Sequence, residues 1–322
     1  MKPTAIAAAL CAAILALVSH PGAADAQTRV TYKSAKSTSS YYQMGVQLAE
    51  AIKAGTDGAV LVTVEESQGS VQNVMEVRAR GADYVFTTPP ALVGLAQAGK
   101  AMFEGKTAPA FETIRALFPI PSLTMHFVVA RESGVTDFAG LEGKTVLLGR
   151  GSFGAREGAK YLEMFGLKDK VTLAEVELSN AVAALKNGQI DGFVTAGSYP
   201  APNVVEAAAS VGVRVLSLSD AQVAKTKRTR IEIPAGTYAG QDESVLTTSL
   251  PVVAFTTTQM ADDTAYALTK TFWERRAAMA EGAPWWNGVS EALMASITGP
   301  IHPGALRYYE EAGFTLTPEQ RP

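Results

Sequence analysis

EVRARGADYVFTT (residues 76–88) and AALKNGQIDGFVTA (residues 183–196) decide the fold. Each stretch runs from a helical pattern through a glycine into an aspartate and a buried strand. We expect Gly81 and Gly188 to end their helices in the left-handed conformation, which glycine adopts without steric cost. The two stretches occur once each, in separate series of strands and helices. They therefore predict two similar α/β lobes and not a solenoid repeat.

Short β-rich runs alternate with amphipathic helical patterns on both sides of these stretches, which favours mostly parallel sheets. Ser70 and Asp262 are expected to cap two of the helices, and Pro89-Pro90 to open another. The expected strands are residues 29–33, 59–66, 83–88, 144–149, 171–178, 191–197 and 213–218, and the expected helices are residues 37–55, 70–81, 154–167, 179–188, 201–210 and 262–279.

Two longer β-rich links, residues 122–131 and 245–258, join the two series. We expect the chain to leave the first lobe along one link and to return along the other, so that the pair forms a hinge. This assigns residues 27–123 and 251–322 to lobe 1 and residues 124–250 to lobe 2.

Residues 1–26 have the pattern of a secretory signal peptide. Lys2 precedes an apolar run over residues 5–18, and Ala24-Asp25-Ala26 offers a cleavage site after Ala26. The apolar run is short for a membrane span. The only cysteine of the chain, Cys11, lies in this segment. We therefore expect an exported mature protein without a disulfide or a thiol nucleophile.

The chemistry of the mature chain argues against several function classes. Its net charge stays at −3, which does not favour nucleic acid as a partner. His126 and His302 accompany no metal-binding motif, so we expect them to be structural. Gly149-x-Gly151-x-x-Gly154 is a single weak match to the dinucleotide fingerprint, and no cofactor is predicted.

Small polar residues gather where strands are expected to lead into helices. In open α/β sheets ligands bind at the carboxyl ends of strands, and helix N-termini there present free N–H groups to anions. Good capping and turn chemistry accounts for part of the pattern. The candidate ligand-binding residues in these segments are Ser37, Thr38, Ser39, Ser40, Tyr41, Gln68, Ser70, Thr87, Thr88, Arg150, Gly151, Ser152, Phe153, Gly154, Ser198 and Tyr199.

The place of three basic residues stays open at this point. Lys36, Arg150 or Arg156 could enter a cleft and add positive charge for an anion. For Arg156 the alternative is a surface pair with Glu157 or Glu163.

IPAGTYAGQDESV (residues 233–245) resembles a signature of the TAXI-type solute receptors of TRAP transporters. Segments in the same order along nearly the whole mature chain share the resemblance: YYQMG (41–45), SQGSVQN (67–73), LEGKTVLLG (141–149), ALKNGQIDGFVTAGSYPAPNV (184–204) and IHPGALRYYEEAGF (301–314).

The resemblance implies a type II periplasmic-binding-protein fold, with two α/β lobes, a two-crossing hinge and a ligand cleft. It also implies a periplasmic receptor that captures a small organic anion and delivers it to a TRAP-type permease. Thr237 and Tyr238 join the candidate ligand-binding residues on this ground. The residues expected to hold the hinge geometry are Gly236, Gly240, Gln241 and Asp242. A monomer is our default expectation.

Three positions depart from the family pattern. Lys36 stands where a glycine is usual, Phe153 where a serine is usual and Ala155 where a threonine is usual. The loss of two hydroxyls and the gain of a ring predict a carboxylate with a larger or more apolar body than glutamate.

Two other functions stay open. The first is a receptor that signals through a partner sensor. The second is an exported enzyme on the same fold, for which the sequence offers no catalytic motif and only these candidate acids: Asp83, Asp191, Asp242 and Glu243.

Overall fold

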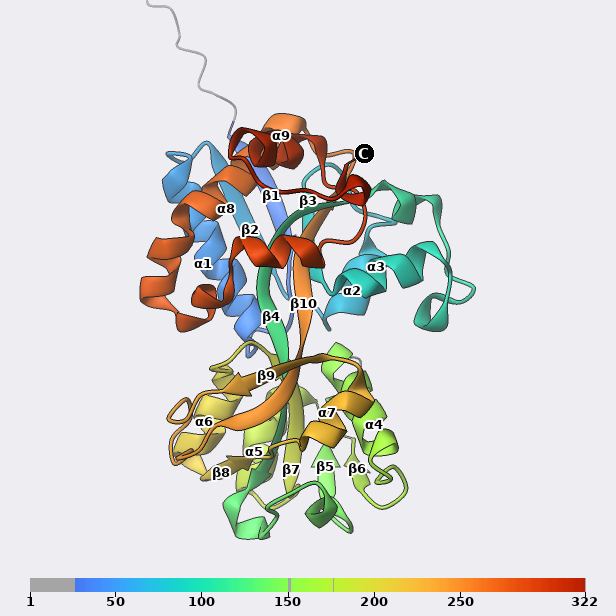
Figure 1. Ribbon diagram of the computed structural model, residues 1–322, viewed down its shortest axis with the longest axis vertical. Coiled ribbons are helices and arrows are strands. Elements are labelled where there is room, and N and C mark those ends of the chain that lie inside the picture. The colour runs from blue at the N-terminus through green and yellow to red at the C-terminus, as the bar shows by residue number, and fades with distance from the viewer. Residues whose placement is uncertain (1–26, 150–151, 176, 322) are drawn as a thin grey trace, which may run out of the picture.

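The structure is a computed structural model that describes residues 27–149, 152–175 and 177–321. The predicted signal peptide and two candidate ligand-binding residues, Arg150 and Gly151, lie outside this part of the chain. Figure 1 shows two α/β halves, one above the other, joined by two long strands that run through both. These crossing strands are β4 (Ile114–Ala130) and β10 (Val245–Thr257).

The upper half of Figure 1 contains the beginning and the end of the chain. β1 pairs in parallel with β2 on one side and with β3 on the other, and β3 pairs with β10 in antiparallel orientation. The strands are β1 (Thr28–Lys33), β2 (Val60–Glu65) and β3 (Tyr84–Thr88), and the helices are α1 (Ser40–Gly55), α2 (Ser70–Glu76), α3 (Pro90–Gln97), α8 (Asp262–Gly282) and α9 (Pro303–Glu311).

The lower half repeats the parallel arrangement, with β5 between β6 and β7. β4 pairs with β7 and β8, and β10 pairs with β9, all in antiparallel orientation. The strands are β5 (Thr145–Leu147), β6 (Thr172–Ala174), β7 (Gly192–Gly197), β8 (Val213–Val215) and β9 (Thr229–Ile233), and the helices are α4 (Phe153–Met164), α5 (Ala181–Lys186), α6 (Pro202–Ser210) and α7 (Asp220–Thr226).

Because β4 and β10 belong to both halves, one hydrogen-bonded path runs through both, in the order β2-β1-β3-β10-β4-β7-β5-β6, and β8 and β9 pair with β4 and β10 beside it. The predicted α/β fold with two lobes and two crossings is confirmed. The exact division that we place inside the crossing strands, after residues 123 and 250, stays a prediction.

Short 3-10 helices complete the chain: η1 (Ala101–Phe103), η2 (Pro109–Thr113), η3 (Arg131–Ser133), η4 (Ala139–Leu141), η5 (Leu178–Asn180), η6 (Pro284–Gly288), η7 (Glu291–Ser296) and η8 (Pro318–Gln320). Among the described residues, none of the helices combines the length and the apolarity needed to cross a bilayer.

In the core of the upper half, aromatic rings of the sheet stack on those of α8. Every residue of β3 is buried, and the Phe118 ring of β4 stacks on Phe272 of α8 at 4.2 Å between centroids. Ala265 and Leu268 lie on the same buried stripe of α8.

Three predicted helix boundaries are wrong. α2 ends at Glu76, because the N–H groups of the next three residues bond to carbonyls three residues earlier, as in a turn, and Gly81 does not have a positive φ. The glycine that precedes α2, Gly69 at φ +111, occupies the N-cap position in place of Ser70. Asp262 is the first residue of α8 and does not cap it. Gly188 adopts the predicted left-handed conformation, with φ +67.

Candidate ligand-binding cleft

A cleft lies between the two halves, where β1, β3 and β7 end and where α1 and α4 begin. The space between its walls measures about 690 Å³, including the part that is open to solvent. The residues that line it are Ser34, Ala35, Lys36, Thr38, Ser39, Tyr41, Gln68, Gly69, Ser70, Thr87, Leu123, Ser152, Phe153, Gly154, Leu178, Thr195, Ala196, Asn203 and Val252.

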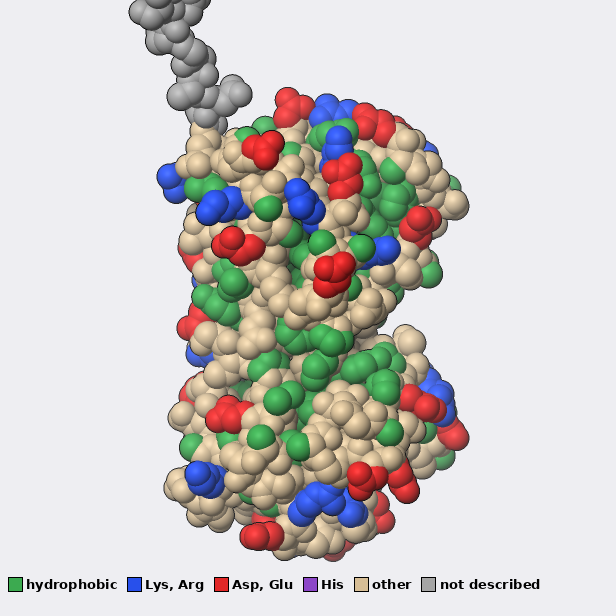
Figure 2. Space-filling model, turned by 90° about the vertical axis from the view of Figure 1, so that its left-hand side faces the viewer, with side chains coloured by type: hydrophobic (Ala, Val, Ile, Leu, Met, Phe, Trp, Pro, Cys, Tyr) green, Lys and Arg blue, Asp and Glu red, His purple; other side chains and the backbone are tan. Residues whose placement is uncertain are grey.

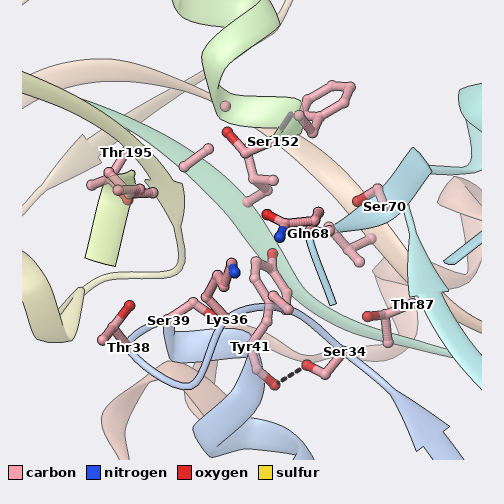
Figure 3. A pocket seen from close by; sticks show the side chains of 18 of the residues that line it. Ser34, Lys36, Thr38, Ser39, Tyr41, Gln68, Ser70, Thr87, Ser152 and Thr195 are labelled. Atoms are coloured by element: carbon pink, nitrogen blue, oxygen red, sulfur yellow. Dashed lines mark hydrogen bonds between the residues drawn. The ribbon is translucent and has the colours of Figure 1, made fainter. Parts of the chain in front are cut away.

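The loop before α1 forms one wall of the cleft (Figure 3). The Ser39 hydroxyl caps α1 by accepting the backbone N–H of Tyr42, and Ser34 Oγ donates to the carbonyl of Tyr41 at 2.7 Å. The Tyr41 hydroxyl donates to the carbonyl of Pro121 on β4 at 2.9 Å. Burial raises the pKa of Tyr41, so its hydroxyl stays protonated and the ring is fixed against the crossing strand.

Asn73 joins the ends of two strands beneath this wall. Its amide nitrogen donates to the carbonyls of Ser34 at 2.7 Å and Thr87 at 2.9 Å, which end β1 and β3. Asn73 is fully buried, and its Oδ1 has no hydrogen-bond partner. The sequence offered no sign of this residue, because only the fold brings the ends of the two strands to one side chain.

The start of α4 forms the opposite wall. Ser152 Oγ accepts the backbone N–H of Ala155 at 2.9 Å and donates to the carbonyl of Gly149 at 3.1 Å. Gly154 lies so close to β7 that a Cβ there would meet the backbone nitrogen of Ala196 at 3.1 Å and its Cβ at 2.8 Å. The absence of a side chain at Gly154 therefore lets α4 present Ser152 and Phe153 to the cleft.

Gly154→Val is expected to lower the free energy of unfolding by about 1–3 kcal/mol, because the added atoms overpack the contact with β7. Urea unfolding followed by circular dichroism measures this change. Gly94→Val is the matched control, since a Cβ at this exposed position of α3 meets nothing within 4 Å. Equal stability of the two variants would contradict the packing role of Gly154.

The charge of the cleft favours an anion. Among the described lining residues Lys36 is the only charged side chain, and hydroxyl and amide groups surround it. The N-termini of α1 and α4 add partial positive charge. Hydrogen bonds from the Ser37 hydroxyl and from the Ser37 backbone N–H hold the pKa of the nearby Glu66 below its usual range. Leu123, Leu178 and Val252, with Phe153, provide an apolar surface for the body of a ligand.

About half of the candidate ligand-binding residues line this cleft: Thr38, Ser39, Tyr41, Gln68, Ser70, Thr87, Ser152, Phe153 and Gly154. Lys36, whose position was open, lines it as well. Sequence reasoning missed Ser34 and Thr195, which lie at or next to the ends of expected strands, and Leu123 and Val252, which lie on the crossing strands.

The structure does not bring seven other candidates into the cleft: Ser37, Ser40, Thr88, Ser198, Tyr199, Thr237 and Tyr238. Ser40 and Ser198 are buried, and Ser40 Oγ accepts the backbone N–H of Ser198 at 3.0 Å. Thr88 is buried in β3. Tyr199 and Thr237 line a different groove.

Arg156 does not line the cleft either. The surface pair considered for it does not form, because Glu157 pairs with Arg228 and Lys160, and Glu163 pairs with Lys168. The Nη2 atom of Arg156 is buried without a hydrogen-bond partner.

Gln241 holds the shape of the loop over residues 233–245. Its Oε1 accepts the backbone N–H of Tyr238 at 3.2 Å, and its Nε2 donates to the carbonyls of Pro234 at 3.0 Å and Glu243 at 2.9 Å. Gly236 and Gly240 have positive φ values of 76° and 73°. The chain therefore folds back on itself around one amide side chain.

Tyr238 connects this loop to the crossing strand. Its hydroxyl lies 2.8 Å from Nε2 of His126 on β4 and accepts the backbone N–H of Ala201, before α6, at 2.9 Å. His126 Nδ1 lies 3.1 Å from the carbonyl of Thr124. Since a carbonyl can only accept, Nδ1 carries the proton and Nε2 accepts from the Tyr238 hydroxyl. His126 is thus a buried, hydrogen-bonded residue.

The fold is expected to lose stability below neutral pH because of His126. Burial lowers the pKa of His126 from 6.5 to about 4. Between these values the unfolded chain binds a proton that the folded protein excludes, so stability falls as the pH falls, by about 3 kcal/mol in total. Burial also lowers the pKa of His302, which acts in the same direction. Urea unfolding across this pH range measures how the free energy of unfolding changes with pH. If His126→Gln leaves this pH dependence unchanged, the loss of stability does not come from His126.

Comparison with known proteins agrees with this geometry. The sequence profile of the NMT1-like family matches residues 33–313. The structure of the periplasmic binding protein BugD superposes with a TM-score of 0.57 at 11% identity, over 89% of this chain and 98% of that chain. MatC from Rhodopseudomonas palustris, with bound malate, superposes with a TM-score of 0.54 at 13% identity, over 80% of this chain and 88% of that chain. These likenesses confirm the predicted two-lobed binding-protein fold.

Proposed function

The chain belongs to the NMT1-like family, and from this premise we propose that it is a periplasmic solute-binding receptor for a small organic anion. The observation that carries the proposal is the cleft between the halves. Lys36 is the only charged side chain among its described lining residues, and hydroxyls, amides and two helix N-termini surround it. MatC, which shares the fold, holds malate in its structure.

The class of anion is a carboxylate with a sizeable apolar body. Ser152 and Thr195 of the lower half face Lys36 and Gln68 of the upper half across the cleft (Figure 3). This polar end suits a carboxylate group, because the Thr195 hydroxyl and the Gln68 amide can donate to carboxylate oxygens and Lys36 supplies the opposite charge. The apolar surface that Phe153, Leu123, Leu178 and Val252 form then covers the rest of the ligand.

We further propose that the receptor serves a TRAP-type permease as a member of the TAXI group. The support is the resemblance of residues 233–245 and of the other segments in the same order. If the receptor serves transport, membrane vesicles that contain the permease take up the anion only when the receptor is added. If it serves a sensor kinase, adding it leaves the uptake unchanged.

The proposal of an exported enzyme has weaker support. Its four candidate acids, Asp83, Asp191, Asp242 and Glu243, do not line the cleft. Asp191 instead accepts the backbone N–H of Thr145 at 2.8 Å and lies 3.9 Å from Lys144 Nζ.

A thermal-shift screen of the mature chain, residues 27–322, tests the proposed function. The panel contains amino acids, dicarboxylates, keto acids and aromatic acids, with neutral sugars as the control class. An anion that binds only the folded protein adds about 2.7 kcal/mol of stability at a hundredfold excess over Kd. A shift with one anion class, without turnover of that compound, supports the receptor. A shift with sugars alone contradicts it.

Phe153→Ser is expected to weaken binding of the native ligand by about tenfold, because the ring no longer covers the apolar body of the ligand. Phe153→Leu keeps an apolar side chain and is the matched control, for which we expect a smaller loss. Isothermal titration calorimetry with the anion found in the screen compares the three proteins. Tighter binding by the serine variant would contradict the apolar ligand class.

A further inference from the structure

One amide in the wall of the cleft makes no hydrogen bond. Asn203 lies in the first turn of α6 and lines the cleft from the lower half. Only 8% of the residue is exposed, and its side chain has no hydrogen-bond partner among the described residues. The described side-chain atoms that are fully enclosed without a partner are Asn73 Oδ1, Arg156 Nη2 and Thr269 Oγ1. The amide of Asn203 is not enclosed in this way, so it reaches the open space of the cleft.

The packing of α6 does not explain an asparagine at this position. The buried residues of the helix are Asn203, Val204, Ala207 and Ala208, and the last three belong to an apolar core cluster. Ala207 lies one turn after Asn203 on the same face of the helix. A buried amide without a hydrogen bond destabilises a fold, and an apolar side chain of similar size does not carry this cost. The amide therefore points to a partner that occupies the cleft.

The loop before α6 holds the start of this helix in place. The backbone N–H of Ser198 donates to Ser40 Oγ at 3.0 Å, and Ser198 Oγ donates to the carbonyl of Ser122 at 2.8 Å. Just before the helix, the backbone N–H of Ala201 donates to the Tyr238 hydroxyl at 2.9 Å. A binding group that is fixed before the ligand arrives loses little conformational freedom on binding. The first turn of α6 is thus suited to a specific ligand contact.

The surroundings of Asn203 are uncharged. Lys36 belongs to the upper half, and it is the only charged side chain among the described residues that line the cleft. Figure 2 views the molecule from the side on which α6 lies in Figure 1. There the waist between the halves shows mainly hydrophobic and uncharged side chains, with most Lys, Arg, Asp and Glu above and below it. A second negative charge of a ligand would therefore be poorly compensated next to Asn203.

The two ends of the Asn203 amide define the group that satisfies it. Nδ2 donates and Oδ1 accepts, so the complementary group must both accept and donate. A hydroxyl and a carboxamide do both. A carboxylate only accepts, so a second carboxylate would leave Oδ1 unpaired beside another negative oxygen. An alkyl group would leave both ends of the amide unpaired.

We infer that Asn203 determines specificity by selecting a monocarboxylate that carries a second, uncharged group, a hydroxyl or a carboxamide. In this arrangement Lys36 binds the carboxylate, the apolar surface of the cleft covers the body of the ligand, and Asn203 binds the second group. The carboxylate rests on the proposed function. The contact with Asn203 rests on its unpaired amide alone.

Matched sets of small molecules test the inference by isothermal titration calorimetry. Each set has one carbon skeleton with a carboxylate at one end, and its members carry hydrogen, a hydroxyl, a carboxamide or a second carboxylate at the other end. Skeletons from butanoate to octanoate, and phenylacetate, vary the distance between the ends. Further members keep the hydroxyl or the carboxamide and lack the carboxylate. We expect the tightest binder to carry both a carboxylate and a hydroxyl or carboxamide. It should bind about tenfold to a hundredfold more tightly than the member with hydrogen.

Asn203→Leu removes the amide and keeps the size of the side chain. We expect this variant to bind the member with hydrogen at least as tightly as the member with the hydroxyl. It should unfold at the same urea concentration as the unchanged protein or at a higher one, because no hydrogen bond is lost. Asn203→Ala removes the amide without adding branched atoms and should lose the preference as well. Asn187→Leu is the matched control, because Asn187 is an exposed asparagine of the same half that does not line the cleft.

The measurements separate this inference from the proposed function. A preference for the hydroxyl or the carboxamide that both Asn203 variants lose, and that Asn187→Leu keeps, supports the inference. Tightest binding of the member with hydrogen or of the dicarboxylate overturns it, as does a preference that the Asn203 variants retain. A clearly lower urea midpoint for Asn203→Leu also overturns it, since it would show a structural role. If only members without a carboxylate bind, and the Asn203 variants lose them, the contact with Asn203 stands and the proposed anion receptor is contradicted. Binding of no member overturns both.

Discussion

Replacing Lys36 with methionine is expected to weaken anion binding by about tenfold to a hundredfold. A hydrogen bond to a charged group contributes about 1.5–3 kcal/mol, and methionine keeps the length of the side chain but not the charge. The loss is expected to be large because Lys36 is the only charged side chain among the described residues that line the cleft. Lys36→Glu should abolish binding, because it places a second negative charge next to the ligand.

The matched control for Lys36→Met is Lys53→Met. It removes an exposed charge in the last turn of α1, the helix that follows the loop of Lys36. Calorimetric titration of both variants at the same ionic strength isolates the local contribution of Lys36 from the change in net charge. If Lys36→Met and Lys53→Met bound the anion equally well, Lys36 would not be a ligand contact.

Tyr238→Phe is expected to produce the largest loss of stability among conservative changes near the crossing strands. The hydroxyl is the partner of both His126 Nε2 and the Ala201 N–H. Without it, these two buried groups are left unpaired, at about 1–3 kcal/mol for each. Urea unfolding at neutral pH measures the difference.

Tyr42→Phe serves as the control for Tyr238→Phe, since Tyr42 is a half-buried tyrosine at the start of α1. We expect it to change the free energy of unfolding by less than about 0.5 kcal/mol, as is usual for substitutions away from buried networks. Similar values for the two variants would mean that the Tyr238 hydroxyl does not join the loop to β4.

Most of the fold follows from local patterns. The alternation of buried strands with amphipathic helices, and the two long β-rich links, predict two α/β lobes with two crossings, and the sheet path shows them. The errors lie at the ends of helices. α2 ends at Glu76 and continues as a turn with hydrogen bonds to carbonyls three residues earlier, although the helical pattern continues to Gly81.

Only the site residues that follow expected strands could be predicted from the sequence. Thr38, Gln68 and Ser152 follow expected strands and line the cleft. Tyr199 and Thr237 were assigned to the same site, yet they line a different groove, together with residues of η6. A sequence pattern shows that a polar residue follows a strand, but which face of a crossing strand the residue meets depends on how the two lobes are packed together.

The side-chain contacts that join distant segments around the cleft were not predictable. Asn73 joins the ends of β1 and β3, and Gln47 holds the two indoles of η6. Each of these amides bonds to residues that are distant in the sequence, so its role appears only when the strands and helices are in place.

A crystal structure of the mature chain with the tightest-binding anion from the screen tests the central claim most directly. The proposal predicts that the carboxylate of the ligand lies within hydrogen-bond distance of Lys36 Nζ and of hydroxyls of the cleft, with its apolar body against Phe153. A ligand bound outside the cleft, or a ligand in the cleft whose anionic group points away from Lys36 into solvent, would contradict it.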